Sequence, residues 1–229
     1  MTEKTLGILM LENTTELPGY MADDRTFPYP VKRIKVPGAT TARVVAGDPA
    51  LRDAYAHYAR QLESEGVSAI TANCGFTALF QDAVAAAVSV PVGLSSLMLV
   101  PHVAAMLPPE KRIGLLTFDR ASLKEEHFAA AGWSSKEIPV AIEGIDGTES
   151  WHQLMAPVPQ PKDEIMISDV MTAVKSLLRS HQDIAGLVFE CTGFPLTADA
   201  VRKETGLPVA DILTLSKMLF DLSSPRRSD

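Results

Sequence analysis

The 229-residue sequence has few cysteines, few aromatic residues and no long apolar run. Two cysteines in a chain of this length do not make a disulfide framework, so we expect a reducing compartment, the cytoplasm. The apolar stretches, such as Val84–Val88, are much too short to cross a bilayer, and we expect no signal peptide. The sequence therefore predicts a protein without a membrane partner.

Positive charge is also scarce, since 21 Lys and Arg residues stand against 28 Asp and Glu residues, a formal net charge of −7. No basic stripe offsets this balance, so no nucleic-acid partner is expected. The sequence contains neither Gly-x-Gly-x-x-Gly nor Gly-Lys-Ser/Thr, which argues against the common nucleotide-binding loops. The five histidines lack metal-ligand spacing, so we expect neither a metal nor another cofactor.

Short apolar runs alternate with longer segments of helical period, which is typical of an α/β protein with mostly parallel sheets flanked by helices. The predicted strands are Thr5–Leu11, Lys32–Val36, Ala69–Thr71, Val90–Val92, Arg112–Thr117, Glu137–Ile142, Ala185–Phe189 and Val209–Asp211. The predicted helices are Pro49–Glu65, Phe76–Val88, Ser95–Leu107, Ala121–Ala131, Glu164–Ser180, Thr197–Thr205 and Ile212–Leu222. Alternating prolines disfavour regular structure in Asp146–Asp163, which we expect to be a loop or lid.

An internal repeat divides the chain. The spacing from Cys74 to Pro91 equals that from Cys191 to Pro208, and the residues around these landmarks are similar in both halves. The repeat predicts two similar lobes related by a pseudo-twofold axis. The predicted lobes are residues 1–106 and 107–211, with a C-terminal helix in 212–229 that closes on the first lobe.

Each cysteine follows a predicted strand and lies just before a glycine that lets the chain turn, in Thr71–Phe76 (TANCGF) and Phe189–Phe194 (FECTGF). Backbone N–H groups at such a turn favour negative charge, so they can lower a thiol pKa or hold a carboxylate. If the lobes face each other, Cys74 and Cys191 lie on opposite sides of one small carboxylate substrate. One thiolate then removes a proton from carbon while the other thiol delivers one. The alternative is that both cysteines are simply buried small residues.

Two further segments border the predicted cleft. The stretch Pro18–Pro37 follows the first strand and is expected to form a wall of the pocket, as loops at the carboxyl ends of strands do. Glu190 directly precedes Cys191. Because neighbouring side chains of a strand alternate sides, we expect Glu190 to point away from the cleft in a capping or ion-pair role, with a catalytic role as the alternative.

The paired cysteine loops, the duplicated lobes and the segment Thr26–Pro30 (TFPYP) resemble the aspartate/glutamate/hydantoin racemase superfamily. The resemblance implies two α/β lobes with the active site between them, cofactor-independent proton transfer beside a carboxylate, and a possible homodimer. It also implies that Cys74 and Cys191 are the acid and base. The implied substrate contacts are Glu12, Asn13, Asn73, Gly75, Phe76, Thr192 and Gly193.

These expectations favour an amino-acid racemase of the aspartate or glutamate type. Gly75-Phe76 stands where such racemases often have Asn-Thr, and Thr192-Gly193 stands where they often have Thr-His, which weakens the case for glutamate. The alternatives within the superfamily are a lyase similar to dimethylsulfoniopropionate lyase, a decarboxylase, and a cis–trans isomerase similar to maleate isomerase. A non-catalytic carboxylate-binding protein is the alternative from another class.

Overall fold

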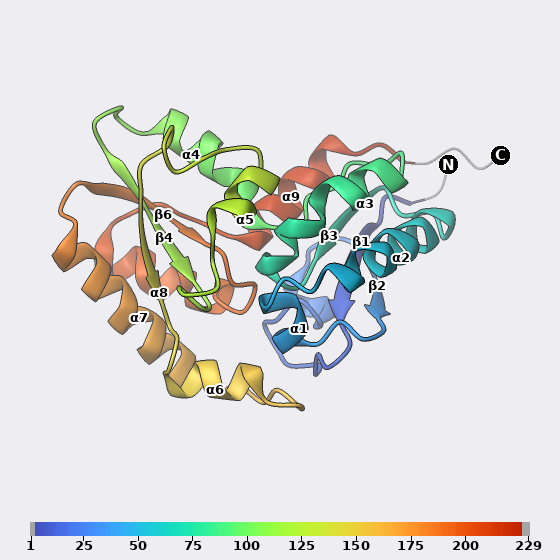
Figure 1. Ribbon diagram of the computed structural model, residues 1–229, viewed down its shortest axis with the longest axis horizontal. Helices are drawn as coiled ribbons and strands as arrows, with labels where there is room; N and C mark the ends of the chain where they lie inside the picture. Colours follow the sequence, from blue (N-terminus) through green and yellow to red (C-terminus); the bar gives the residue numbers. More distant parts are fainter. Residues whose placement is uncertain (1–2, 226–229) are drawn as a thin grey trace.

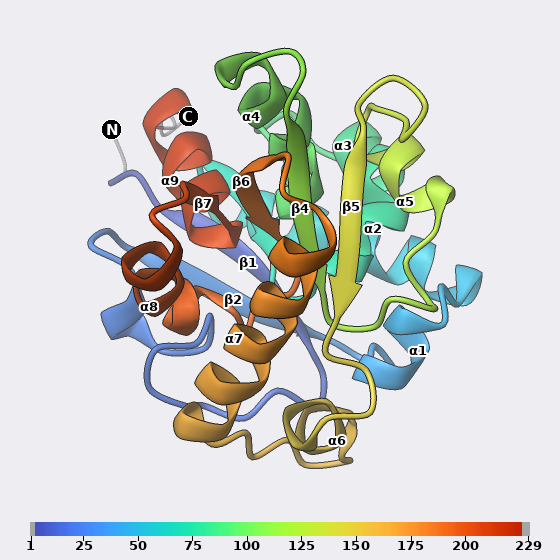
Figure 2. The same cartoon turned by 90° about the vertical axis from the view of Figure 1, so that its left-hand side faces the viewer.

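The parallel strands form two sheets, one in each lobe (Figures 1 and 2). The structure is a computed structural model that describes residues 3–225, so residues 1–2 and 226–229 of the predicted lobes lie outside the described residues. The first sheet has the order β2-β1-β3, from β1 (Leu6–Leu11), β2 (Val31–Val36) and β3 (Ala69–Ala72). The second has the order β5-β4-β6-β7, from β4 (Arg112–Thr117), β5 (Val140–Gly144), β6 (Ile184–Phe189) and β7 (Val209–Ala210). The predicted fold class is confirmed.

The two sheets are built alike. β1 lies between β2 and β3, as β4 lies between β5 and β6. Beyond β3 and β6, the chain after the matching prolines adds to the edge of each sheet. The N–H of Ile70 donates to the carbonyl of Pro91 at 2.9 Å, and the N–H of Leu187 donates to the carbonyl of Pro208 at 2.8 Å. In the first lobe the predicted strand Val90–Val92 is reduced to one isolated bridge to Ile70. The lobes are therefore similar, as the repeat predicts.

Every residue of β1 is buried, because helices cover both faces of the first sheet. Leu9 and Leu11 pack in the same cluster as Leu62 of α2 (Arg52–Ser64). Leu6 and Ile8, on the other face, pack in a cluster with Leu215 and Leu219 of α9 (Ile212–Leu222). The C-terminal helix therefore packs on the first sheet.

The second sheet is flanked by α7 (Asp163–Ser180), which packs on β4 and β5, and by α8 (Pro195–Thr205), which packs on α7 and β7 (Figure 2). Its remaining cover comes from α4 (Val100–Met106), which packs on β4. A Cβ at Gly186 of β6 would lie 3.1 Å from Leu107 and 3.5 Å from Val103. The last helix of each half thus covers the sheet of the other half, and the exact division of the lobes at residue 106 stays a prediction.

Several elements differ from the predictions. The helices expected over Pro49–Glu65, Phe76–Val88 and Ser95–Leu107 each begin with a 3-10 turn. A helix, α6 (Glu149–Met155), forms inside Asp146–Asp163, because Thr148 caps it by accepting from Trp151 N at 3.3 Å and the prolines begin only after it ends. The helix expected over Ala121–Ala131 is shortened to α5 (Glu125–Ala130), and β5 begins three residues later than expected. The remaining elements are α1 (Thr41–Val45), α3 (Gln81–Ala87), and the 3-10 turns Asp24–Thr26, Pro49–Leu51, Gly75–Phe80 and Ser96–Leu99.

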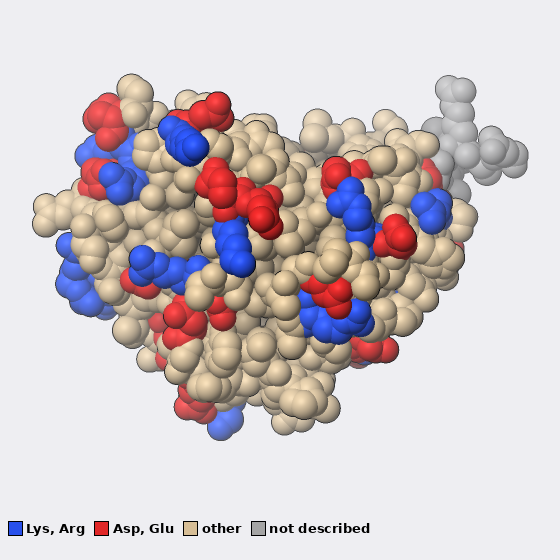
Figure 3. Space-filling view, in the orientation of Figure 1, with Lys and Arg blue, Asp and Glu red and all other residues tan. Residues whose placement is uncertain are grey.

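The surface carries mixed charge. On the face drawn in Figure 3, Lys and Arg side chains are interspersed with Asp and Glu side chains. Within residues 3–225, no helix combines the length and the apolar character needed to cross a bilayer.

Candidate active site

A cavity of about 90 Å³ lies where the loops of the two lobes meet. Residues just beyond the ends of four strands line it: Asn13 after β1, Asn73 after β3, Phe118 after β4 and Glu190 after β6. Loops at the carboxyl ends of parallel strands are the usual position of a ligand site in α/β proteins. The volume equals that of roughly six to nine water molecules, which suits a small organic acid.

Both cysteines lie in the cavity wall as free thiols, with Cys74 9% and Cys191 8% exposed. Their loops have the same local geometry, because in each loop the N–H groups of the second and third residues after the cysteine face its sulfur. These residues are Phe76 and Thr77 after Cys74, and Gly193 and Phe194 after Cys191. The structure thus brings the two predicted acid/base residues into one cavity.

The thiols are harder to ionise than the sequence predicts. Burial, with a smaller contribution from the nearby Glu190, raises the pKa of Cys74 to about 12, because the two backbone N–H groups offset these effects only in part. Burial, with Glu190, also raises the pKa of Cys191 well above its ordinary value. The expectation of lowered thiol pKa values is therefore wrong, because loss of hydration outweighs the N–H groups.

Glu190 is fully buried and lines the cavity, so the expectation that it points away from the cleft is wrong. β6 ends at Phe189, so the alternation of sides in a strand no longer fixes the direction of the next side chain. Oε2 accepts hydrogen bonds from Thr117 Oγ1 at 2.8 Å and from Phe118 N at 3.2 Å. Oε1 is buried and has no hydrogen-bond partner among residues 3–225. Burial raises the pKa of this carboxyl to about 7.

Gly75 of the first lobe faces Glu190 of the second. A Cβ at position 75 would lie closer than 3.0 Å to Oε1 and to the backbone carbonyl oxygen of Glu190. Gly75 does not have a positive φ, so the requirement for glycine is steric and not conformational. The carboxyl group of Glu190 therefore occupies the space that a side chain at position 75 would need.

Tyr20 is a cavity residue that the sequence does not single out, although it lies within the predicted wall Pro18–Pro37. Its hydroxyl is buried without a hydrogen-bond partner in the described part of the chain, and burial raises its pKa. Its ring lies 3.5 Å from the position of a Cβ at Gly193 in the opposite loop. Only the position of the wall, not the residue, could be predicted.

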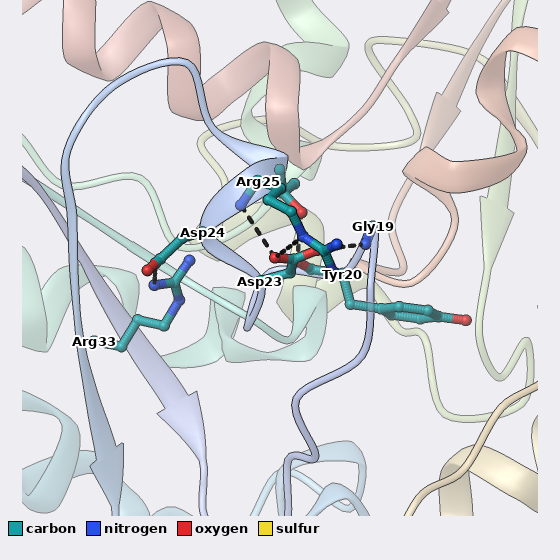
Figure 4. A network of polar contacts seen from close by, with 7 residues as sticks. Gly19, Tyr20, Asp23, Asp24, Arg25 and Arg33 are labelled. Atoms are coloured by element: carbon teal, nitrogen blue, oxygen red, sulfur yellow. Dashed lines mark hydrogen bonds and ion pairs between the residues drawn. The ribbon is translucent and has the colours of Figure 1, made fainter.

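A cluster of polar contacts within the segment Pro18–Pro37 holds the loop that carries Tyr20. The carboxylate of Asp23 accepts from the N–H of Gly19 at 3.1 Å, and Arg33 donates to the carbonyl of Met21 at 2.8 Å while its guanidinium pairs with Asp24. Figure 4 shows the ring of Tyr20 pointing away from this cluster. The cluster lies outside the cavity and anchors the loop that carries Tyr20.

Six of the seven predicted substrate contacts line the cavity, namely Asn13, Asn73, Gly75, Phe76, Thr192 and Gly193. Glu12 does not: its side chain is exposed, and its carboxylate accepts from the N–H of Gly38 at 2.9 Å. The expected substrate contact of Glu12 is therefore not supported, because this residue follows the end of β1 at Leu11 and its carboxylate is bonded to Gly38 outside the cavity.

Two of the polar contacts also hold the loops together. Asn73 Oδ1 accepts from Leu11 N at 2.7 Å, and Asn73 Nδ2 donates to Thr14 Oγ1 at 2.7 Å. Thr192 Oγ1 donates to the carbonyl of Asn73 at 2.5 Å, which joins the two cysteine loops across the lobes. These groups position the site as well as line it.

The segment Asp146–Asp163 covers the cavity from the side of the second lobe, through Leu154, Pro159 and Pro161. Thr15 Oγ1 donates to the carbonyl of Pro159 at 2.5 Å and so links this segment to the first lobe. His152 is exposed and does not line the cavity.

The cavity is acidic in character. Of the described residues that line it, none is Lys, Arg or His, and Glu190 is the only carboxylic acid. Within residues 3–225, no group of three or more His, Cys, Asp or Glu side chains is arranged to hold a metal ion. The donors that the lining residues offer to a ligand carboxylate are therefore hydroxyl, side-chain amide and backbone N–H groups.

Solved structures with the same fold cover almost the whole chain. An arylmalonate decarboxylase variant in a sulfate-associated form has a TM-score of 0.65 at 15% identity and covers 97% of each chain. A putative Asp/Glu racemase from Yersinia pestis has a TM-score of 0.59 at 17% identity and covers 95% of this chain and 98% of its own. The chain therefore has the fold of arylmalonate decarboxylase and of the aspartate/glutamate racemases, which is the fold that the resemblance in the sequence implies.

Sequence relatives define the family within this fold. A dimethylsulfoniopropionate lyase from Durusdinium sp. clade D is 31% identical over 216 residues, which are 91% of this chain and 71% of the relative. Dimethylsulfoniopropionate lyase 7 from Emiliania huxleyi is 27% identical over 225 residues, 92% of this chain and 64% of the relative. The chain belongs to the dimethylsulfoniopropionate lyase family, although it spans less than two thirds of the Emiliania relative. No protein-family model matches the chain.

Proposed function

We propose that the protein is a lyase that eliminates dimethyl sulfide from dimethylsulfoniopropionate and leaves acrylate. The observation that carries this proposal is the charge of the cavity, which offers one buried carboxyl, Glu190, and no Lys, Arg or His among its described lining residues. Dimethylsulfoniopropionate has one carboxylate and one positive sulfonium group. Aspartate and glutamate would each bury a second carboxylate without a cationic partner, which is costly. The family membership supports the same reaction.

The elimination needs one base. The thiolate of Cys74 or Cys191 removes a proton from the carbon next to the substrate carboxylate. The released electron pair forms the carbon–carbon double bond, while the carbon–sulfur bond breaks and its electron pair leaves with dimethyl sulfide. The proton passes from the cysteine to water. No cofactor takes part in this balance.

The positive substrate also explains how a buried thiol becomes a base. An opposite charge within about 4–6 Å lowers the pKa of a thiol by roughly 1–3 units, and the sulfonium group brings such a charge into the cavity. The backbone N–H groups that face each sulfur then stabilise the thiolate. For Cys74, with a pKa of about 12, such a shift raises the thiolate fraction roughly tenfold to a thousandfold at neutral pH, although the thiol stays the major form.

Incubation with dimethylsulfoniopropionate, followed by gas chromatography of dimethyl sulfide and liquid chromatography of acrylate, tests the proposal. We expect release of both products in equal amounts. At least one of Cys74→Ser and Cys191→Ser should lose roughly a hundredfold to ten-thousandfold of kcat, the usual contribution of a positioned acid or base. Absence of dimethyl sulfide, or full activity in both variants, refutes the proposal.

A racemase is the second candidate, because the matching geometry of the two thiols suits a proton donor and a proton acceptor on opposite faces. Racemisation needs both thiols, so both serine variants should lose activity equally, and solvent deuterium should enter the α-carbon. Chiral chromatography of aspartate and glutamate in D₂O separates this outcome from elimination.

The homodimer implied by the resemblance stays a prediction, and light scattering after size-exclusion chromatography tests it. A reducing location is also a proposal, and it agrees with the free state of Cys74 and Cys191.

A further inference from the structure

Glu190 carries a polar atom that the fold leaves without a partner. The side chain is fully buried, and Oε1 accepts no hydrogen bond within residues 3–225, whereas Oε2 has two donors. Nearly all buried polar atoms of proteins are hydrogen-bonded or paired, so a carboxylate oxygen that lies without a donor against Gly75, just behind the cavity wall, calls for a ligand that compensates its charge. The mechanism above uses only the thiols and does not account for this atom.

The position of the carboxyl group depends on Gly75. Any side chain at position 75 would overlap Glu190 Oε1, so the two residues share one volume between the lobes. The racemases that the sequence resembles often have asparagine at this place. In this chain the amide is absent and a carboxyl group from the other lobe fills the space, which exchanges a neutral group for an acidic one.

We infer that Glu190 binds the positively charged onium group of the substrate, and that Gly75 makes room for it, an assignment that rests on the proposed lyase function. Three aromatic residues, Tyr20, Phe76 and Phe118, line the same cavity and provide surfaces for the methyl groups of an onium ion. Aromatic faces attract such cations through their quadrupole. Glu190 and Gly75 thus select a zwitterion over a simple acid.

Among residues 3–225, no Lys or Arg forms an ion pair with Glu190 or lines the cavity. Thr117 and Phe118 of the second sheet hold Oε2, and the Asp119 carboxylate that follows them raises the pKa of Glu190 further. The thiols of Cys74 and Cys191 are the other titratable groups close to it. With a pKa of about 7, Glu190 is near half ionised at neutral pH, so a cation that binds there must displace a proton.

A pair of ligands that differ only in charge tests the inference. β-Alanine betaine carries a quaternary ammonium group and its carbon isostere carries a quaternary carbon, and neither has a sulfonium leaving group. Isothermal titration calorimetry at pH 8 should show that the wild-type protein binds the betaine at least about tenfold more tightly than the isostere, which corresponds to one pKa unit of coupling. Glu190→Gln should abolish this preference and still bind the isostere, which shows that the variant is folded. The matched control Glu143→Gln, on β5 and outside the cavity, should keep the preference.

Proton release provides a second readout on the wild-type protein. At pH 7, binding of the betaine should release about half a proton, measured in two buffers of different ionisation enthalpy, and binding of the isostere should release none. Equal affinity for both ligands, a preserved preference in Glu190→Gln, or proton release that persists in Glu190→Gln overturns the inference.

The outcomes also separate this inference from the proposed function. A Glu190-dependent preference for the betaine without production of dimethyl sulfide retains the onium site and refutes the lyase. Production of dimethyl sulfide with an unchanged preference in Glu190→Gln retains the lyase and refutes the onium site.

Discussion

Gly75→Ala should destabilise the protein strongly although it adds only one methyl group. The new Cβ would lie closer than 3.0 Å to both the carboxyl group and the backbone carbonyl of Glu190. The carboxyl group can rotate only by giving up its hydrogen bonds with Thr117 and Phe118, and the carbonyl cannot move without the loop. The two cysteine loops must therefore separate.

The cost can be worked out from this overlap. Overpacking a well-packed site costs about 1–3 kcal/mol, and involvement of the backbone places this case at the upper end, about 3 kcal/mol. For a chain of this size, such a loss lowers the melting temperature by roughly 6–12 °C. Thermal denaturation followed by circular dichroism, together with urea titration, measures both quantities.

Gly193→Ala is the matched control, because it adds the same methyl group in the second cysteine loop. Its Cβ would lie 3.5 Å from Tyr20 and 3.7 Å from the sulfur of Cys191, which are ordinary contacts. We expect a change below about 1 kcal/mol for this variant. If Gly75→Ala is as stable as the wild type, or if both variants lose equal stability, the reasoning about shared space is refuted.

Three further predictions concern titration and the contact between the lobes. Since burial raises the pKa of Cys74 to about 12, iodoacetamide should alkylate the ligand-free protein at pH 7 at least about tenfold more slowly than it alkylates free cysteine. The alkylation rate should rise with pH. Alkylation as fast as that of free cysteine would contradict the raised pKa. Because the pKa of Glu190 is raised from 4.5 to about 7 in the folded state, its protonated form contributes about 3 kcal/mol that is complete below pH 4.5 and is lost as pH rises through 7. Urea titrations should show this loss in the wild type but not in Glu190→Gln, and parallel pH profiles would argue against it. Thr192→Val removes the hydrogen bond to the carbonyl of Asn73 and should lower the free energy of unfolding by about 1–2 kcal/mol, whereas Thr192→Ser keeps the hydroxyl and should lose less, as urea titration can verify; a Thr192→Val variant as stable as the wild type would refute a stabilising role of this hydrogen bond.

Much of the fold could be predicted because its strands are short, apolar and buried on both faces. The bounds of β4 equal those predicted for the strand Arg112–Thr117. The bounds of α9 equal those predicted for the helix Ile212–Leu222, whose first residue follows the capping Asp211. The prediction failed where one local signal outweighed another. The prolines in Asp146–Asp163 obscured the seven residues of α6, which have their own cap at Thr148.

The site could be predicted as far as the two cysteine loops determine it. The internal repeat predicts that Cys74 and Cys191 lie in one cavity, and the structure confirms this. That prediction needs only the equal spacing of the repeat and no information about the residues around each cysteine. The direction of Glu190, the thiol pKa values and the place of Tyr20 depend on how the lobes meet, and no local pattern encodes that contact. Glu12 illustrates the same limit, because its neighbour in space is Gly38 and not a ligand.

The exchange of α4 and α9 between the halves bears on how this molecule can be taken apart. Each sheet takes part of its apolar cover from the other half of the chain, so a fragment cut near residue 106 would expose a hydrophobic surface. Separately expressed halves should aggregate or stay unstructured alone, yet regain a working catalyst when mixed, in the manner of a split reporter. The two lobes are therefore similar in build but are not independent folding units.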